Sequence, residues 1–112
     1  MSDFKVPVND YLFLFNDVLD MQQKYQRVKG GDQATPDMLE AIFSEGAKFC
    51  ENEVAPLYQS GDDGCQWNQG NVTTPTGFKE AYNKYIESGW PSLTGSQEFG
   101  GQGLPTSVSS AF

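Results

Sequence analysis

Apolar residues recur at helical spacing in three stretches of this chain, and each stretch predicts a helix. The first runs from residue 8 or 9 to residue 22, with Asn9 or Asp10 as the cap of its exposed N–H groups. Phe13 and Leu14 make this helix apolar over more than half of its circumference, so it should pack against two neighbouring elements. Its main stripe consists of Val8, Tyr11, Leu12, Phe15, Val18 and Leu19.

The second predicted helix opens with Thr35 as its N-cap and Pro36 at its first position, and Asp37 places a negative charge where the helix dipole favours one. We expect Pro56 to end it. Gly46 lies within its apolar stripe, which indicates a close approach by another helix at that point. The stripe consists of Leu39, Ile42, Phe43, Gly46, Cys50 and Val54.

The third predicted helix repeats this opening, with Thr74 as N-cap and Pro75 at its first position. Gly89 stands where a left-handed residue commonly follows a helix, and Trp90-Pro91 prevents continuation. Its apolar stripe consists of Phe78, Ala81, Tyr82, Tyr85 and Ile86.

The connecting segments are rich in glycine and polar residues. Gly30-Gly31 predicts a flexible connection, and residues 59–73 predict a loop of about fifteen residues that Trp67 could pin down. Residues 92–105 are expected to be irregular. A fourth helix begins near Pro105 or Thr106, and we expect the sequence to be truncated within it. Since no stretch alternates convincingly with period two, the predicted fold is all-α: a small helical bundle with long glycine-rich loops.

Charge and length restrict the classes of partner. The 112 residues suit one domain or part of one, and 15 acidic against 7 basic residues give a net charge of −8. This charge disfavours nucleic acid and anionic membranes, and it argues against polyphosphate binding by this segment alone. The start carries no secretion signal, and the longest apolar run, residues 11–15, is far too short to span a membrane. Cytoplasm is therefore the expected location.

Candidate catalytic and metal-binding residues are scarce. The chain has no histidine, which excludes Ser-His-Asp and Cys-His catalysis, and Cys50 and Cys65 are expected to be reduced thiols. No metal site is expected. The acidic residues Asp62, Asp63, Glu51 and Glu53 lack the regular spacing of a calcium loop, so they are interpreted as solvated surface charge.

The glycine-rich segment invites a nucleotide-binding interpretation, which its context disfavours. Gly101-Gln102-Gly103 has no preceding strand, and Thr106 stands at the position of the third glycine of the dinucleotide-binding motif. The alternative is a connector whose glycines permit unusual backbone angles. Glu98 lies beside Phe99 in the same segment, where it could line a pocket or be a solvated turn residue.

Two motifs in the second half of the chain resemble the acyl-CoA dehydrogenase family. In that family a helical N-terminal domain carries a Gly-Trp loop followed by a Glu-Tyr/Phe-Gly-Gly-x-Gly element. The form seen here looks closest to the branch with an N-terminal extension, which includes the 3-methylmercaptopropionyl-CoA dehydrogenases. The matching residues are Gly89-Trp90-Pro91-Ser92-Leu93 and Glu98-Phe99-Gly100-Gly101-Gln102-Gly103-Leu104-Pro105, supported by Asn16-Asp17-Val18-Leu19, Cys65-Gln66-Trp67 and Thr74-Pro75-Thr76-Gly77-Phe78.

This resemblance implies a homo-oligomeric flavoenzyme that introduces an α,β double bond into an acyl-CoA thioester. The glutamate base and most FAD contacts of the family lie in middle and C-terminal domains that follow this region, so no catalytic or cofactor-binding residue is assigned here and no cofactor is expected in this chain alone. Residues 1–34 would form an N-terminal extension with one helix and a linker, and residues 35–112 the truncated helical domain. Glu98, Phe99, Gly100 and Gly101 are the candidate residues for one wall of the acyl pocket.

Two other classes of function compete with this interpretation. A stand-alone helical interaction or dimerisation module would explain the apolar first helix, and a small independent enzyme would need catalytic groups that the chain lacks. The abundant aromatic residues exceed what a modest core needs. We therefore expect the isolated chain to self-associate, to exchange an element between copies or to be only marginally stable.

Overall fold

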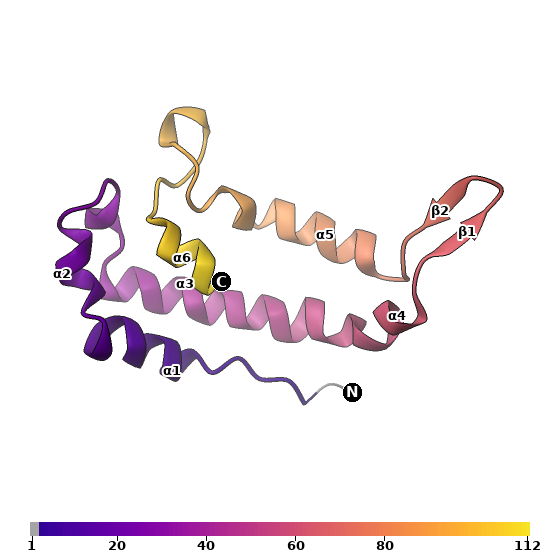
Figure 1. Ribbon diagram of the computed structural model, residues 1–112, viewed down its shortest axis with the longest axis horizontal. Coiled ribbons are helices and arrows are strands. Elements are labelled where there is room, and N and C mark those ends of the chain that lie inside the picture. Colours follow the sequence, from indigo (N-terminus) through magenta and orange to yellow (C-terminus); the bar gives the residue numbers. More distant parts are fainter. Residues whose placement is uncertain (1–2) are drawn as a thin grey trace.

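The helices of this chain lie in a flat layer. The computed structural model describes residues 3–112, which extend over 54 × 35 × 17 Å. Helix α3 (Pro36–Phe49) runs along the layer, with α1 (Val8–Phe13) on one side and α5 (Phe78–Glu87) on the other (Figure 1). The other elements are α2 (Met21–Tyr25), α4 (Tyr58–Asp63), α6 (Thr106–Ala111), β1 (Gln66–Asn68), β2 (Asn71–Thr73), π-helical turns at Leu14–Val18 and Cys50–Val54, and 3₁₀ turns at Gly31–Gln33, Ala55–Leu57, Trp90–Ser92 and Gln97–Phe99. The predicted all-α class is confirmed.

One apolar core joins both ends of the chain to α3. The ring of Phe15 meets that of Phe43 edge-on at a centroid distance of 5.1 Å. The hydroxyl of Tyr25 lies 2.7 Å from the hydroxyl of Ser107. Both the predicted extension and the predicted helical domain contribute to this core, and the boundary at residue 34 stays a prediction. The buried core residues are Phe15, Tyr25, Ala34, Leu39, Ile42, Phe43, Leu93, Leu104 and Val108.

The prediction of a single first helix from residue 8 or 9 to residue 22 is wrong at both ends and in its continuity. Pro7 precedes α1 and no side chain caps it, so neither Asn9 nor Asp10 is the N-cap. A π-helical turn follows α1, with the N–H of Leu19 donating to the carbonyl of Leu14 at 2.8 Å. The wider π turn shifts the phase of the apolar stripe, and Asp20 at φ 45° then ends the helix. Its last two stripe residues, Val18 and Leu19, are therefore about half exposed.

The second helix begins as predicted but continues past its predicted end. The Thr35 hydroxyl accepts a hydrogen bond from the N–H of Met38 at 3.2 Å, and Pro36 is the first helical residue. Pro56 does not end the helical path, because it falls in the first turn of a 3₁₀ segment, where a missing N–H leaves no helical bond broken. The path continues into α4. The close approach expected at Gly46 is present: a Cβ there would lie 2.8 Å from the ring of Phe112.

Residues 59–73 are not the irregular loop that was predicted. They contain most of α4 and an antiparallel hairpin in which Trp67 faces Val72. Gln69 and Gly70 both have positive φ, as the tight turn of a two-residue hairpin requires. The strands have three residues each and are fully exposed, so no alternating pattern could reveal them. Trp67 does not pin the segment down, since 73% of it is exposed.

The third helix begins later than predicted. The N–H of Phe78 donates to the carbonyl of Pro75 in a turn, and Gly77 at φ 89° precedes α5. A left-handed residue at this position interrupts the helical path, so Thr74 does not cap the helix and Pro75 is not its first residue. Gly89, at φ 81°, is the predicted left-handed residue after α5. The start of α6 at Thr106 is also confirmed.

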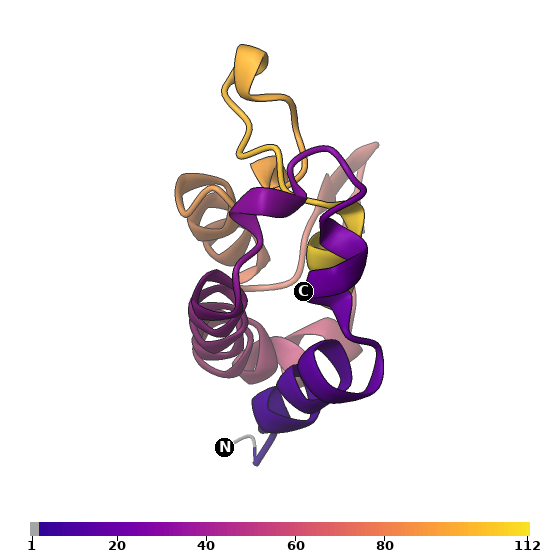
Figure 2. The same cartoon turned by 90° about the vertical axis from the view of Figure 1, so that its left-hand side faces the viewer.

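Gly30-Gly31 is a close-packed turn and not a flexible connection. Gly30 has φ 79°, and a Cβ there would overlap the carbonyl oxygen of Gly103. A Cβ on Gly31 would overlap the carbonyl oxygen of Tyr25. The absence of both side chains lets the N-terminal segment rest directly on the backbone that leads into α6 (Figure 2).

The flat shape leaves much apolar surface uncovered. The chain exposes 7968 Å², whereas a folded monomer of 12.4 kDa exposes about 6,100 Å². Its radius of gyration is 16.9 Å, against about 13 Å for a compact domain of this length. Helix α5 contains no buried residue at all. The layer therefore has the proportions of one part of a larger packed structure.

Replacing Thr35 with alanine should destabilise the chain by about 1 kcal/mol, because the N–H of Met38 loses its acceptor. Thr74→Ala is the matched control, since Thr74 is exposed and precedes α5 without capping it. Urea unfolding followed by circular dichroism measures both effects. Equal destabilisation by the two substitutions would contradict the assigned N-cap.

Gly30→Ala should lower the midpoint of thermal unfolding by about 5 °C more than Gly70→Ala. Both glycines have φ near 80°, so both substitutions cost the same left-handed strain. Only at Gly30 does the new methyl group meet backbone, whereas nothing lies within 4 Å of the corresponding position at Gly70. Similar midpoints for the two variants would show that the contact with Gly103 is absent in solution.

Candidate functional site

The glycine-rich segment after α5 forms a closed projection, the glycine finger (residues 95–103), which stands out from the helical layer (Figures 1 and 2). Two backbone hydrogen bonds close its base: Leu104 N–H donates to the Leu93 carbonyl at 3.0 Å and Gln102 N–H to the Ser92 carbonyl at 2.9 Å. Because Leu93 and Leu104 belong to the buried core, the finger has a rigid root.

The tip of the finger presents an aromatic ring to solvent. The Ser96 hydroxyl accepts a hydrogen bond from the N–H of Glu98 at 3.3 Å and starts the 3₁₀ turn Gln97–Phe99. Gly100, at φ 88°, ends this turn. Phe99 lies between these two constraints and is 84% exposed. The turn therefore holds the ring of Phe99 at the tip of the finger, open to solvent.

The finger brings together the four predicted pocket-wall residues. Glu98, Phe99 and Gly100 are exposed, and Gly101 is half-buried. None of them lines either of the two cavities described below. A Cβ on Gly101 would overlap the backbone of Gly95, so this glycine is required by the finger itself. The pocket-wall role stays a prediction.

The backbone N–H groups of residues 101–103 already donate to carbonyl groups of residues 92–96. Gly101 N–H donates to the Ser96 carbonyl at 2.9 Å, Gly103 N–H to the Gly95 carbonyl at 2.8 Å, and Gln102 N–H to the Ser92 carbonyl. A phosphate-binding glycine loop needs free N–H groups that point at the ligand. Residues 101–103 therefore do not form a phosphate-binding loop.

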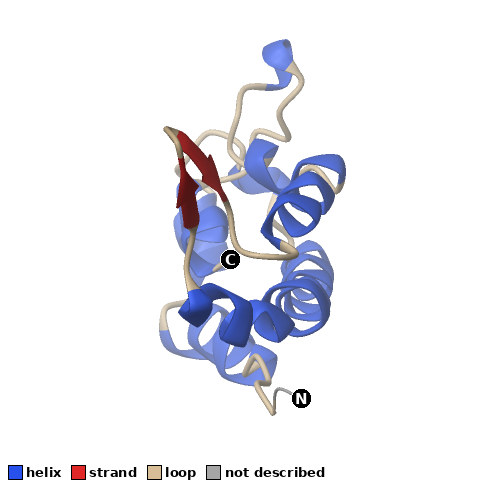
Figure 3. Cartoon of the chain, turned by 90° about the vertical axis from the view of Figure 1, so that its right-hand side faces the viewer, coloured by secondary structure: helices blue, strands red, loops and turns tan. Residues whose placement is uncertain are grey.

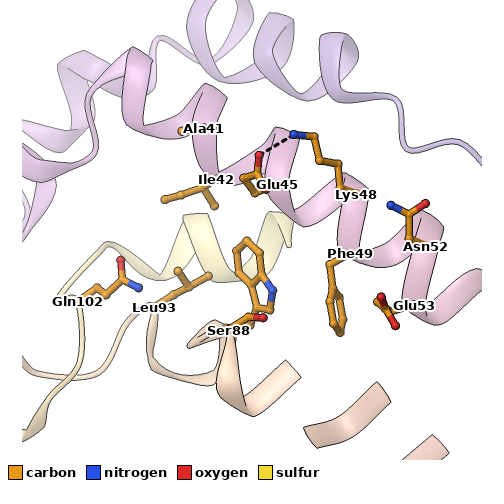
Figure 4. Close-up of a pocket in the computed structure, with 11 residues that line it drawn as sticks. Ala41, Ile42, Glu45, Lys48, Phe49, Asn52, Glu53, Ser88, Leu93 and Gln102 are labelled. Carbon is orange, nitrogen blue, oxygen red and sulfur yellow. Dashed lines mark hydrogen bonds and ion pairs between the residues drawn. The ribbon is translucent and has the colours of Figure 1, made fainter. Parts of the chain in front are cut away.

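An open pocket of about 550 Å³ with a mixed polar and apolar lining lies between α3 and the segment after α5 (Figure 4). Ile42, Phe49 and Leu93 form apolar parts of its lining, while Lys48 and Glu45 form an ion pair of 2.7 Å at its edge. Both charged side chains are more than half exposed, so this pair adds little stability. Ser88 and Gln102 supply further polar atoms.

A larger depression, the apolar groove, lies between the α3–α4 path and α5 and has a volume of about 920 Å³. The side chains of Glu53 and Lys84 join these two elements through an ion pair of 2.7 Å. Most of its exposed lining is apolar. Principal lining residues are Val54, Leu57, Tyr58, Phe78, Tyr82, Tyr85 and Phe112.

The apolar groove was not located from the sequence. The excess of aromatic residues pointed to uncovered apolar surface, but it drew attention to the first helix. Tyr82 and Tyr85 do lie on the predicted stripe of α5, and Val54 on that of α3. These stripes were expected to face a core. The part of the second stripe with Leu39, Ile42 and Phe43 does face the core. Val54, Tyr82 and Tyr85 instead face an open groove, which the described residues cover at one end only, where Phe112 follows α6.

Cys50 lies in the apolar groove and is half-buried. Burial raises the pKa of its thiol, and the neighbouring Glu51 carboxylate raises this pKa further by repelling the thiolate. The same carboxylate accepts a hydrogen bond from the N–H of Val6 at 2.8 Å. A thiol with a raised pKa is a weak nucleophile at neutral pH, so Cys50 is not suited to covalent catalysis.

Glu51→Gln should speed the alkylation of Cys50 by iodoacetamide at pH 8. Removing the negative charge lowers the pKa of the thiol and raises the thiolate fraction, by less than about tenfold because burial, the larger cause, stays in place. Glu45→Gln is the control, since this carboxylate pairs with Lys48 on the surface. An unchanged or slower rate in the Glu51 variant would contradict the assigned electrostatic effect.

No helix within residues 3–112 is long and apolar enough to cross a membrane. In the same part of the chain, no three side chains of the metal-binding types gather at one place.

The helical layer and its Glu-Phe-Gly-Gly finger define a small all-α unit like the one that the acyl-CoA dehydrogenase resemblance implied. No protein-family model matches the chain. It is 32% identical over 109 residues to the 3-methylmercaptopropionyl-CoA dehydrogenase of Ruegeria pomeroyi, and this match covers 96% of the chain. The predicted resemblance to the acyl-CoA dehydrogenases is thereby confirmed. The chain spans only 18% of the length of that relative.

Proposed function

We propose that this chain is the N-terminal helical domain of an FAD-dependent acyl-CoA dehydrogenase. The observation that carries the proposal is the 32% identity to an acyl-CoA dehydrogenase along nearly the whole chain. The reaction would introduce an α,β double bond into an acyl-CoA thioester. The chain itself would support this reaction structurally, because it has no histidine and the Cys50 thiol is a weak nucleophile at neutral pH.

The proposed contribution of this domain to the site is one wall of the acyl pocket. The glycine finger would carry that wall, with Phe99 as its apolar contact and Gly100 and Gly101 allowing close approach of the backbone. Glu98 stands beside them and would border the wall. The rigid root of the finger supports this role, since a pocket wall must keep its position while substrate binds. Residues 35–112 would form the helical domain and residues 1–34 its extension.

The described residues are not suited to form the main binding site of FAD. The net charge of −8 repels the pyrophosphate, and the N–H groups of residues 101–103 already donate to carbonyl groups of the chain. In such enzymes the flavin, when bound, accepts hydride from the substrate. We therefore assign FAD binding to the middle and C-terminal domains of the longer polypeptide, and no cofactor to this chain alone.

The partners of this domain follow from the same proposal. They are the later domains of the same polypeptide, the acyl-CoA substrate and, in the assembled enzyme, further copies of the chain. Exposed apolar surface on an acidic layer supports packing against protein and not against nucleic acid or an anionic membrane. The cytoplasm is the proposed location. A stand-alone interaction module is the less favoured alternative, because it leaves the similarity to a dehydrogenase unexplained.

The natural polypeptide that contains this sequence tests the proposal. After purification it should be yellow, contain FAD and reduce an electron acceptor when given an acyl-CoA, starting with 3-methylmercaptopropionyl-CoA. Residues 1–112 alone should show neither property. A natural polypeptide that ends at Phe112, or a longer one without flavin, would overturn the proposal.

Phe99→Ala in that polypeptide should lower kcat/KM by about tenfold, which corresponds to about 1.4 kcal/mol of lost apolar contact at the acyl pocket. The FAD content should not change. Phe13→Ala is the matched control, because Phe13 is also exposed but lies on α1, away from the glycine finger. Equal kcat/KM values for Phe99→Ala and the unmodified enzyme would remove Phe99 from the pocket wall.

A further inference from the structure

We propose that Gln33 is a positioning residue for the acyl pocket: it holds the glycine finger, and with it Phe99, in the orientation that contacts the acyl chain. This inference rests on the proposed function, because it requires Phe99 to be part of the pocket wall. It goes further by giving the N-terminal segment a role in substrate binding, exerted through a ring in the second half of the chain.

The glycine finger is anchored at its root and open at its tip. Two backbone hydrogen bonds close the root, whereas the tip stands clear of the helices in both side views (Figures 2 and 3). The hydrogen bonds inside the finger fix its shape but not its direction relative to the layer. A pocket wall needs a fixed direction as well, since a displacement of about 1 Å is enough to weaken contact with the substrate.

The side chain of Gln97 couples the tip of the finger to its base. Gln97 is the first residue of the 3₁₀ turn that carries Phe99, and its Nε2 donates to the Gln102 carbonyl at 3.5 Å. The aliphatic part of the same side chain packs against Gly103, where an added Cβ would lie 3.3 Å from Gln97 Cγ. The position of this side chain is therefore coupled to that of Phe99, two residues later.

The side chain of Gln33 holds Gln97 from outside the finger. Its Oε1 accepts a hydrogen bond from the Nε2 of Gln97 at 3.1 Å. Close to this bond in the sequence, Gly30 rests directly on the backbone of Gly103, with no room for a side chain between them. The N-terminal segment thus holds the finger at two points, and the Gln33 contact is the one that acts on the turn carrying Phe99.

Gln33 itself has a firm support. It ends the 3₁₀ turn Gly31–Gln33, and its N–H donates to the Gly30 carbonyl at 3.2 Å. The next residue, Ala34, is fully buried, and its carbonyl accepts a hydrogen bond from the Gln22 side chain at 2.8 Å. Because this turn is fixed to α2 and to the core, the hydrogen bond from Gln33 restrains the finger and does not simply follow its movement.

The exposure of both glutamines sets the size of the expected effect. Gln33 and Gln97 are exposed, so loss of their hydrogen bond should leave the fold intact. It should lower the fraction of molecules with the finger in the held orientation by about threefold, as one such bond can do. A less well placed wall binds ground state and transition state more weakly to the same extent, so KM rises and kcat stays unchanged.

A double-mutant cycle in the natural polypeptide tests this role. With 3-methylmercaptopropionyl-CoA, Gln33→Ala should raise KM about threefold at unchanged kcat and FAD content. In the Phe99→Ala background the same substitution should have no further effect, because Gln33 acts through Phe99. Gln33→Glu should restore KM, since a carboxylate oxygen also accepts from Gln97. Gln26→Ala is the matched control: Gln26 is exposed on the same segment, and its side chain makes no hydrogen bond within residues 3–112.

The cycle also separates a positioning role from a general structural one. A rise in KM of equal size in both backgrounds, a rise that Gln33→Glu does not reverse, or an unchanged KM for Gln33→Ala would each overturn the inference. The FAD content of the unmodified polypeptide is measured first. A polypeptide without flavin contradicts the proposed function, and this inference with it, whereas a yellow, active enzyme with unchanged KM contradicts only the role of Gln33.

Discussion

The thickness of the helical layer is the constraint on which the other features depend. Helices pack with their axes about 8–10 Å apart, and the described chain is only 17 Å thick, so it holds at most two helices one above the other. Helices α3 and α5 lie at one level and α1, α2 and α6 at the other (Figure 2), and none of them is covered on both sides. Apolar stripes on α3 and α5 meet each other along one edge and leave the apolar groove open along the other. The large exposed surface is a direct consequence of this geometry.

Direct contact between backbones joins the N-terminal segment to the glycine finger and closes the finger itself. Gly30 rests against Gly103, and Gly95 rests against Gly101, at distances that no side chain would permit. The first contact joins the N-terminal segment to the root of the glycine finger, and the second closes the finger itself. Because Leu93 and Leu104 anchor that root in the core, the orientation of the finger is coupled to the N-terminal segment. An extension of this kind can therefore position a surface far from it in the sequence.

The glycine finger shows how a motif can be structural where it resembles a ligand-binding loop. The N–H groups of residues 101–103 donate to carbonyl groups of residues 92–96, so the glycines serve tight chain reversal and leave Phe99 as the exposed apolar group. In the proposed function, this finger contributes shape and apolar contact to a site whose reactive groups come from other domains. This division of labour agrees with a chain that spans 18% of the dehydrogenase it resembles.

Much of the helical architecture could be predicted from local chemistry. Thr35 and Pro36 mark the start of α3, Gly89 follows α5 in the left-handed conformation, and α6 begins at Thr106, because caps and turn residues act within one helical turn. The same reasoning failed at Thr74-Pro75, where an equally good start signal is followed by Gly77 at positive φ. A local signal permits a helix but does not compel one.

By itself the sequence determined the all-α class, the acidic surface and the resemblance to the acyl-CoA dehydrogenases, since these depend on composition, periodicity and motif. Only the tertiary structure decided the phase shift of the π-helical turn after α1, the exposed hairpin around Gln69-Gly70, and the location of the apolar groove. These features depend on which faces find a neighbour in space. An apolar stripe has the same sequence pattern whether it faces a core or an open groove.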